Sequence, residues 1–145
     1  MTTPSPTSRA GAATPNQVVG YVFGVVYLLV GSVGFLVTRG VDFAATEGKN
    51  LIFFEINPLH NVVHLLIGAA LLLAASRGAA ASRGMNMLVG VVYAVVGILG
   101  FFIHSTDANI LALNGADHLL HLATAAVLVI VASSGRSSAP TASVS

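Results

Sequence analysis

The chain has 145 residues, of which 55% are hydrophobic and only 8% are charged, and its formal net charge is +1. A soluble domain carries about 25% charged residues, so this composition excludes an ordinary water-soluble globule and indicates a membrane protein. Cysteine is absent, which excludes disulfides, thiolate zinc sites, iron–sulfur clusters and cysteine nucleophiles. The sequence has no basic stripe, so it predicts the lipid bilayer, and not nucleic acid, as a partner.

Four apolar segments are long enough to cross the hydrocarbon core of a membrane, which takes about 20 helical residues. They are Val18–Thr38, Pro58–Ser76, Met85–Ile103 and Ala116–Ala132. The first is longer than the apolar part of a typical signal peptide, so we interpret it as a retained span. The sequence therefore predicts an all-α membrane protein, a four-helix bundle, with disordered tails at residues 1–17 and 133–145.

Basic residues near the predicted spans indicate how the chain is oriented. The predicted spans place four basic residues on one side of the membrane, namely Arg9, Arg77, Arg83 and Arg136. They place Arg39 and Lys49 on the other side. Because short cytoplasmic segments carry the excess of Lys and Arg, we expect both termini in the cytoplasm. The predicted location is the bacterial cell membrane.

The sequence contains an internal repeat. The segment GVVYLLVGSVGF, from Gly24, matches GVVYAVVGILGF, from Gly90, without a gap. The even-numbered spans match as well, because Asn57, His60 and His64 align with Asn114, Asp117 and His121. Two tandem two-helix repeats that cross the membrane in the same sense predict pseudo-two-fold symmetry about an axis along the membrane normal.

Glycine and tyrosine recur at i, i+3, i+7 and i+10 in the odd-numbered spans, which places them on one helical face. The residues are Gly24, Tyr27, Gly31 and Gly34 in the first repeat, and Gly90, Tyr93, Gly97 and Gly100 in the second. Small residues let helices approach closely in lipid, so the pattern favours a packing seam, and the alternative is a space cleared for a flat ligand. Counting the helical rise puts Gly31 and Gly97 at the depth of His64 and His121, so we expect two histidines opposite two glycines.

The even-numbered spans begin with residues that suit helix starts. Asn57 can cap its helix with Pro58 at the first helical position, where a missing N–H costs nothing. Asn114 can cap the last helix, and Asp117 lies near the positive end of that helix.

The histidines in these spans are candidate functional residues. His60 and His64 are four residues apart and share a helical face, and Asp117 and His121 repeat the same spacing. His64 and His121 lie inside the apolar zone, where an ionisable side chain should face the bundle interior and is a functional-site hypothesis.

Three interpretations of these histidines stay open. Neutral imidazoles can hydrogen-bond between helices. Alternatively, His60, His64, Asp117 and His121 bind zinc, copper or iron, or His64 and His121 serve as axial haem ligands. Finally, the histidines belong to a proton or small-solute path, with an outer mouth at Glu55, His104 and Asp107.

The string Asn-Pro-Leu-His-Asn-Val-Val-His at residues 57–64, followed by Leu-Leu-Ile-Gly68, resembles the hallmark of a known family. Asp117-His-Leu-Leu-His121 and the Gly/Tyr pattern are similar to it as well, and the resemblance covers roughly residues 18–132. The family comprises small four-helix bacterial membrane proteins, common in actinobacteria, and is catalogued as domain of unknown function 4383. The resemblance implies a multi-pass membrane protein and supplies no catalytic residue.

The sequence favours a non-enzymatic accessory or scaffold protein that contacts a membrane-protein partner or a second copy of itself. This expectation rests on the lack of any nucleophile–base set, phosphate loop or intramembrane acid–base pair. The alternatives are a haem- or metal-binding redox component that uses His64 and His121, and a small-solute or proton transporter.

Overall fold

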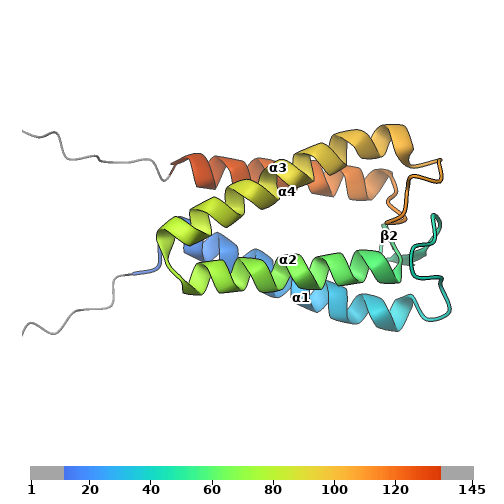
Figure 1. Ribbon diagram of the computed structural model, residues 1–145, viewed down its shortest axis with the longest axis horizontal. Helices are drawn as coiled ribbons and strands as arrows, with labels where there is room; N and C mark the ends of the chain where they lie inside the picture. The colour runs from blue at the N-terminus through green and yellow to red at the C-terminus, as the bar shows by residue number, and fades with distance from the viewer. Residues whose placement is uncertain (1–11, 135–145) are drawn as a thin grey trace, which may run out of the picture.

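The computed structural model of the protein describes residues 12–134, which form four helices and one short antiparallel hairpin. The elements are α1 (Pro15–Val37), β1 (Lys49–Leu51), β2 (Phe54–Ile56), α2 (Pro58–Ser76), α3 (Ala79–Ile103) and α4 (Gly115–Ser134). Figure 1 shows α1 and α2 in one layer and α3 and α4 in the other. We call the end where the described chain starts and stops the termini end, and the end that carries β1 and β2 the hairpin end. The parts of the predicted tails at residues 1–11 and 135–145 lie outside the described residues.

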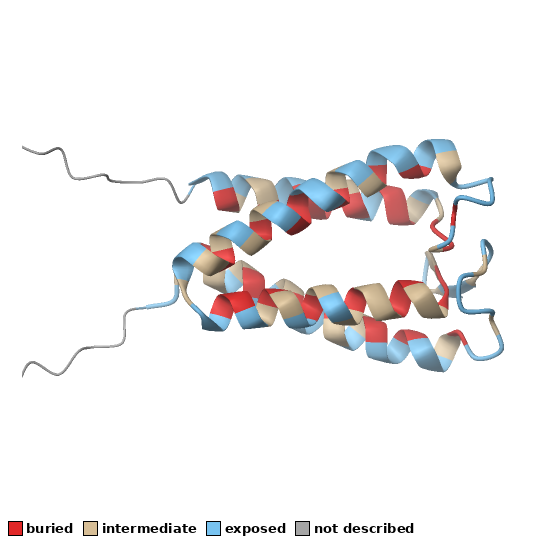
Figure 2. Ribbon diagram, in the orientation of Figure 1, coloured by how far each residue is buried: buried red, intermediate tan, exposed pale blue. Residues whose placement is uncertain are grey.

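All four helices are long and apolar enough to span a membrane, so the chain is a multi-pass membrane protein, as predicted. Figure 2 shows that their outward faces are mostly exposed, whereas the buried residues face the middle of the bundle. Large apolar side chains such as Leu29, Leu66, Phe102 and Ile130 cover the exposed surface. In water such a surface would be unfavourable, whereas lipid chains solvate it without cost.

The predicted helix boundaries hold for α2, whereas α1, α3 and α4 begin earlier than predicted, and α4 continues to Ser134, two residues into the predicted tail at 133–145. The predicted tail includes residues 15–17, but α1 begins at Pro15 because Thr14 and Gln17 form a reciprocal capping box. The third helix begins at Ala79, not at Met85, because Gly78 adopts a positive φ of 113° and lets the chain reverse at once after α2.

Glycines let the two helices of each helical hairpin, α1–α2 and α3–α4, pack closely. A Cβ atom at Gly31 would lie 2.8 Å from the backbone oxygen of Asn61, and one at Gly97 would lie 2.8 Å from Cγ of Leu122. Neither glycine faces the imidazole of His64 or His121, which pack against Tyr27 and Tyr93, so the expected arrangement of histidines opposite glycines is wrong. Gly31 also faces Leu65, the repeat equivalent of Leu122. The pseudo-two-fold symmetry of the complete halves stays a prediction.

Side-chain amides join the α1–α2 half to the α3–α4 half at both ends of the bundle. At the termini end, Asn16 Nδ2 donates a hydrogen bond to the Val131 carbonyl (3.1 Å), and Asn86 Nδ2 donates one to the Asn16 carbonyl (3.0 Å). At the hairpin end, Asn57 Nδ2 donates one to the Ile110 carbonyl (2.8 Å). Between these ends lies the core cluster of Tyr27, Leu71, Val89, Tyr93, Ala125 and Leu128, and the candidate site adjoins this cluster on the side of the hairpin end.

Candidate functional site

The N-terminal turn of α2 fixes the position of His60. Asn57 is the N-cap of this helix, and its Oδ1 accepts a hydrogen bond from the backbone N–H of His60 at 2.8 Å. Pro58 occupies the first helical turn, where it costs no hydrogen bond. His64 follows one turn deeper, so the cap sets the direction in which both imidazoles enter the bundle.

The start of α4 is tied to β2 and thereby places His121. Asn114 Oδ1 accepts hydrogen bonds from the N–H groups of Ala116 (2.9 Å) and Asp117 (3.1 Å). Asp117 Oδ2 accepts hydrogen bonds from the N–H groups of Asn114 (3.0 Å) and Glu55 (3.1 Å). Because Glu55 belongs to β2, the Asp117 carboxylate links the β1–β2 hairpin to α4. His121 lies one turn further along α4.

Three histidines from α2 and α4 meet in the centre of the bundle. His60 Nε2 and His64 Nε2 lie 3.1 Å apart, and the ring centroids of His60 and His121 lie 6.2 Å apart. One nitrogen from each of the three rings lies within 4.8 Å of the others. The side chains are 2%, 9% and 6% exposed for His60, His64 and His121, so the cluster is almost completely removed from solvent.

Two tyrosines from α1 and α3 complete the cluster. The ring of Tyr27 stacks on His64 with centroids 5.2 Å apart, and Tyr93 meets His121 edge to face at 4.7 Å. The two tyrosine rings lie 5.7 Å from each other. Sequence reasoning placed both tyrosines on the glycine seam and did not predict these contacts.

Several buried polar atoms of the cluster make no hydrogen bond to the described residues. They are Nδ1 of His60, His64 and His121 and the hydroxyls of Tyr27 and Tyr93. Buried polar groups normally have partners, and each unpaired group costs about 1–3 kcal/mol. Five of the nine unpaired buried side-chain atoms of the described residues belong to this cluster, and the others belong to Asn61, Asn86 and His118. Unpaired groups that line a cavity can be satisfied by an ion or a polar ligand.

The remaining predicted site residues lie in different surroundings. Asp117 lines the same cavity as the three histidines, but its carboxylate accepts the two backbone hydrogen bonds described above. His118 packs against Gly100 and Phe101 and is not part of the cluster. Glu55, His104 and Asp107 line one pocket of about 570 Å³ at the hairpin end.

The arrangement can bind a metal ion through imidazole nitrogens, hydrogen-bond a small polar group, or do both.

Comparison with known proteins identifies the family but not the activity. The chain matches no curated protein and no solved structure. A family model described as domain of unknown function (DUF4383) matches residues 17–134. The chain therefore belongs to this family of proteins with a domain of unknown function.

Proposed function

We propose that this membrane protein binds one transition-metal ion through His60, His64 and His121 and acts as a non-enzymatic accessory protein. The observation that carries the proposal is the approach of three imidazole nitrogens to within 4.8 Å of one another in the bundle centre. Neutral imidazole is a preferred ligand of zinc and copper ions, and both are bound by sets of three histidines.

The spacing of the nitrogens supports an ion between the rings. Two nitrogens bound at about 2.1 Å to a tetrahedral ion lie about 3.4 Å apart. The 3.1 Å between Nε2 of His60 and Nε2 of His64 is close to this value. His121 then supplies the third ligand from the other hairpin, so that one ion would hold the two hairpins together.

The space beside the histidines favours a bare ion over haem. The cavity that the cluster lines has a volume of about 180 Å³. Pockets for cofactors and drug-sized ligands occupy about 300–1,000 Å³, so a macrocycle between His64 and His121 would require the helices to move apart.

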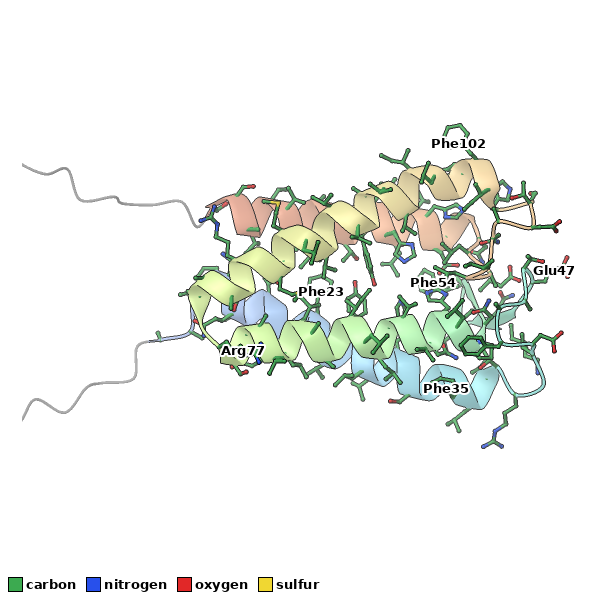
Figure 3. All side chains as sticks on the ribbon, in the orientation of Figure 1. Phe23, Phe35, Glu47, Phe54, Arg77 and Phe102 are labelled. Atoms are coloured by element: carbon green, nitrogen blue, oxygen red, sulfur yellow. The ribbon has the colours of Figure 1, made fainter. Side chains whose placement is uncertain are left out.

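The accessory role is supported by the exterior of the bundle and by its charge distribution. Exposed apolar side chains on all four helices suit contact with lipid or with another membrane protein. Figure 3 shows Arg77 at the termini end and Glu47 at the hairpin end. We propose that the termini end faces the cytoplasm of a bacterial cell, since Arg77 and Arg83 lie at this end.

Elemental analysis of the detergent-purified protein tests the metal site. We expect about one zinc or copper ion per chain after expression in medium that contains both metals. His64→Ala and His121→Ala should each remove most of the bound metal, because either change leaves only two imidazoles. Substitution with Co²⁺ should give visible absorption bands typical of tetrahedral nitrogen coordination, and the same variants should lose them.

His104→Ala is the matched control, because His104 is exposed and lies outside the cluster. This variant should retain the full metal content. Metal-free wild-type protein under these conditions, or equal metal loss in His104→Ala and His64→Ala, would overturn the proposed site.

A further inference from the structure

The cavity beside the histidines has one polar region and otherwise apolar walls. Phe23 and Val30 of α1 and Ile56 of β2 supply apolar surface. Leu51, Ile52 and Phe54 of the β1–β2 hairpin line the cavity at the hairpin end, where Ile52 is 75% exposed. Figure 3 shows Phe23 and Phe54 between the two layers of helices, whereas Phe35 and Phe102 lie on the outside. A ligand of this cavity therefore needs an apolar body and a small number of polar atoms.

Besides the border at exposed Ile52, the cavity has a lateral mouth between α1 and α4. Val26 and Leu120 line it and yet are 44% and 46% exposed, which places them at its mouth. The two helices that carry them pack only lightly against each other, in contrast to the close packing within each hairpin. Because both helices span the membrane, a mouth between them faces lipid and not water.

The volume of the cavity restricts its occupant to the size of one ring. A cavity of about 150 Å³ lined by apolar side chains in another protein binds benzene. The present cavity, at about 180 Å³, has room for a single substituted six-membered ring, but not for a fused ring system with its substituents. Any longer part of the molecule has to leave through the mouth into the bilayer.

The unpaired hydroxyls define the chemistry of that ring. Tyr27 and Tyr93 are 7% and 4% exposed and line the cavity together with Thr124. The Tyr27 hydroxyl has the hydroxyls of Tyr93 and Thr124 as neighbours, but neither tyrosine hydroxyl forms a hydrogen bond within 3.5 Å among the described residues. A tyrosine hydroxyl is a good donor, so a ring oxygen that accepts a hydrogen bond satisfies it. Carbonyl oxygens on an apolar ring meet this need at little cost of desolvation.

We propose that the cavity binds the head of a membrane-dissolved benzoquinone, with its carbonyl oxygen at Tyr27 and Tyr93 and its apolar tail leaving between α1 and α4. This site goes beyond the proposed metal centre and does not require the ion, because the hydrogen bonds come from tyrosines and not from the three histidines. The proposed step is binding alone.

The test compares two probes of equal tail length. One is a benzoquinone with a ten-carbon tail, and the other is decylbenzene, which has the same tail and no oxygen. Isothermal titration calorimetry of the detergent-solubilised protein should give an affinity for the quinone at least tenfold higher. Tyr93→Phe should lower quinone affinity about threefold to tenfold, the range expected for one hydrogen bond, and leave decylbenzene unaffected.

Blocking the mouth after folding tests the route of entry. The chain has no cysteine, so a single introduced cysteine can be alkylated selectively in the folded protein. Alkylation of Val26→Cys or Leu120→Cys with N-phenylmaleimide should abolish quinone binding. The neighbouring positions Val25 and Leu119 are 47% and 64% exposed and do not line the cavity, so alkylated Val25→Cys and Leu119→Cys should bind normally.

All titrations are repeated with zinc-loaded and with chelator-treated protein, which separates this site from the metal centre. Quinone binding in both states, with loss only at Val26 and Leu120, supports the proposal even when no metal is bound. Equal affinity for the two probes, or equal loss at Val25 and Val26, would overturn it whatever the metal content.

Discussion

Two glycines in the same helix show how the surroundings of a single Cα atom determine its role. A Cβ atom at Gly97 would lie 2.8 Å from Cγ of Leu122 and 3.2 Å from the His118 carbonyl, closer than ordinary van der Waals contact. A Cβ atom at Gly84 would meet nothing within 4 Å. The first glycine is required for the approach of α4, and the second is not.

Alanine substitutions should therefore have opposite effects on stability at these two positions. Gly97→Ala overpacks the α3–α4 contact and should cost about 1–3 kcal/mol of unfolding free energy. Gly84→Ala should be neutral or stabilise by up to about 1 kcal/mol, because alanine is the better helix former. Thermal unfolding followed by circular dichroism in detergent measures both. Similar shifts in Tm for the two variants would contradict the assigned role of Gly97.

The histidine cluster could be predicted from the sequence only in part. His60 and His64 follow from their i, i+4 spacing, and the repeat indicated His121 as their counterpart. Asp117 was included by the same analogy, but its carboxylate binds the N–H of Glu55, which is 62 residues away in the chain. No local pattern predicts such a contact, because it depends on how β2 lies against α4.

The turn from β2 into α2 shows how one side chain can organise a whole element. Asn57 is fully buried, and it binds the first turn of α2 through Oδ1 and two separate connections through Nδ2. The acceptors of the Nδ2 bonds are the carbonyls of Ala45 and Ile110, at 2.7 and 2.8 Å. Helix cap and loop anchor are therefore combined in a single amide.

Two substitutions of Asn57 should separate these roles. Asn57→Ser keeps a capping oxygen but is too short to reach both carbonyls, so it should destabilise the hairpin end. Asn57→Ala also loses the capping oxygen and should lower the free energy of unfolding by about 1 kcal/mol more. Chemical denaturation measures both values, and Asn50→Ala, at an exposed position of β1, is the control. A loss in Asn57→Ala no larger than that in Asn50→Ala would contradict both roles.

At the level of elements, composition predicted the four helices well and the β1–β2 hairpin not at all. Ile52 and Phe53 connect β1 to β2, although neither is a typical turn residue, and Ile52 has a positive φ of 62°. The first turns of α3 were missed because Ser82 and Arg83 reduce the apolar character of that segment. Ser82 is nevertheless buried, and its hydroxyl donates a hydrogen bond to the Ala74 carbonyl of α2 at 3.3 Å.

For the whole molecule, the proposed orientation can be tested by cysteine labelling, since the chain has no native cysteine. Ser76 and Thr106 are exposed and lie at the termini end and the hairpin end, respectively. In intact cells, a membrane-impermeant maleimide should label Thr106→Cys, and it should label Ser76→Cys only after permeabilisation. The reverse pattern would show that the termini end faces outward.

The amide bonds at the two ends of the bundle limit how the hairpins can move. Asn16 and Asn86 join them at one end and Asn57 at the other, whereas the middle is held by the apolar contacts of the core cluster and by ring contacts such as that of Tyr27 with Tyr93. The distance between the two helical hairpins should therefore fluctuate most halfway along the bundle, while the two ends keep their relative positions. Distances between spin labels on the two helical hairpins would then vary more at the midsection than at either end.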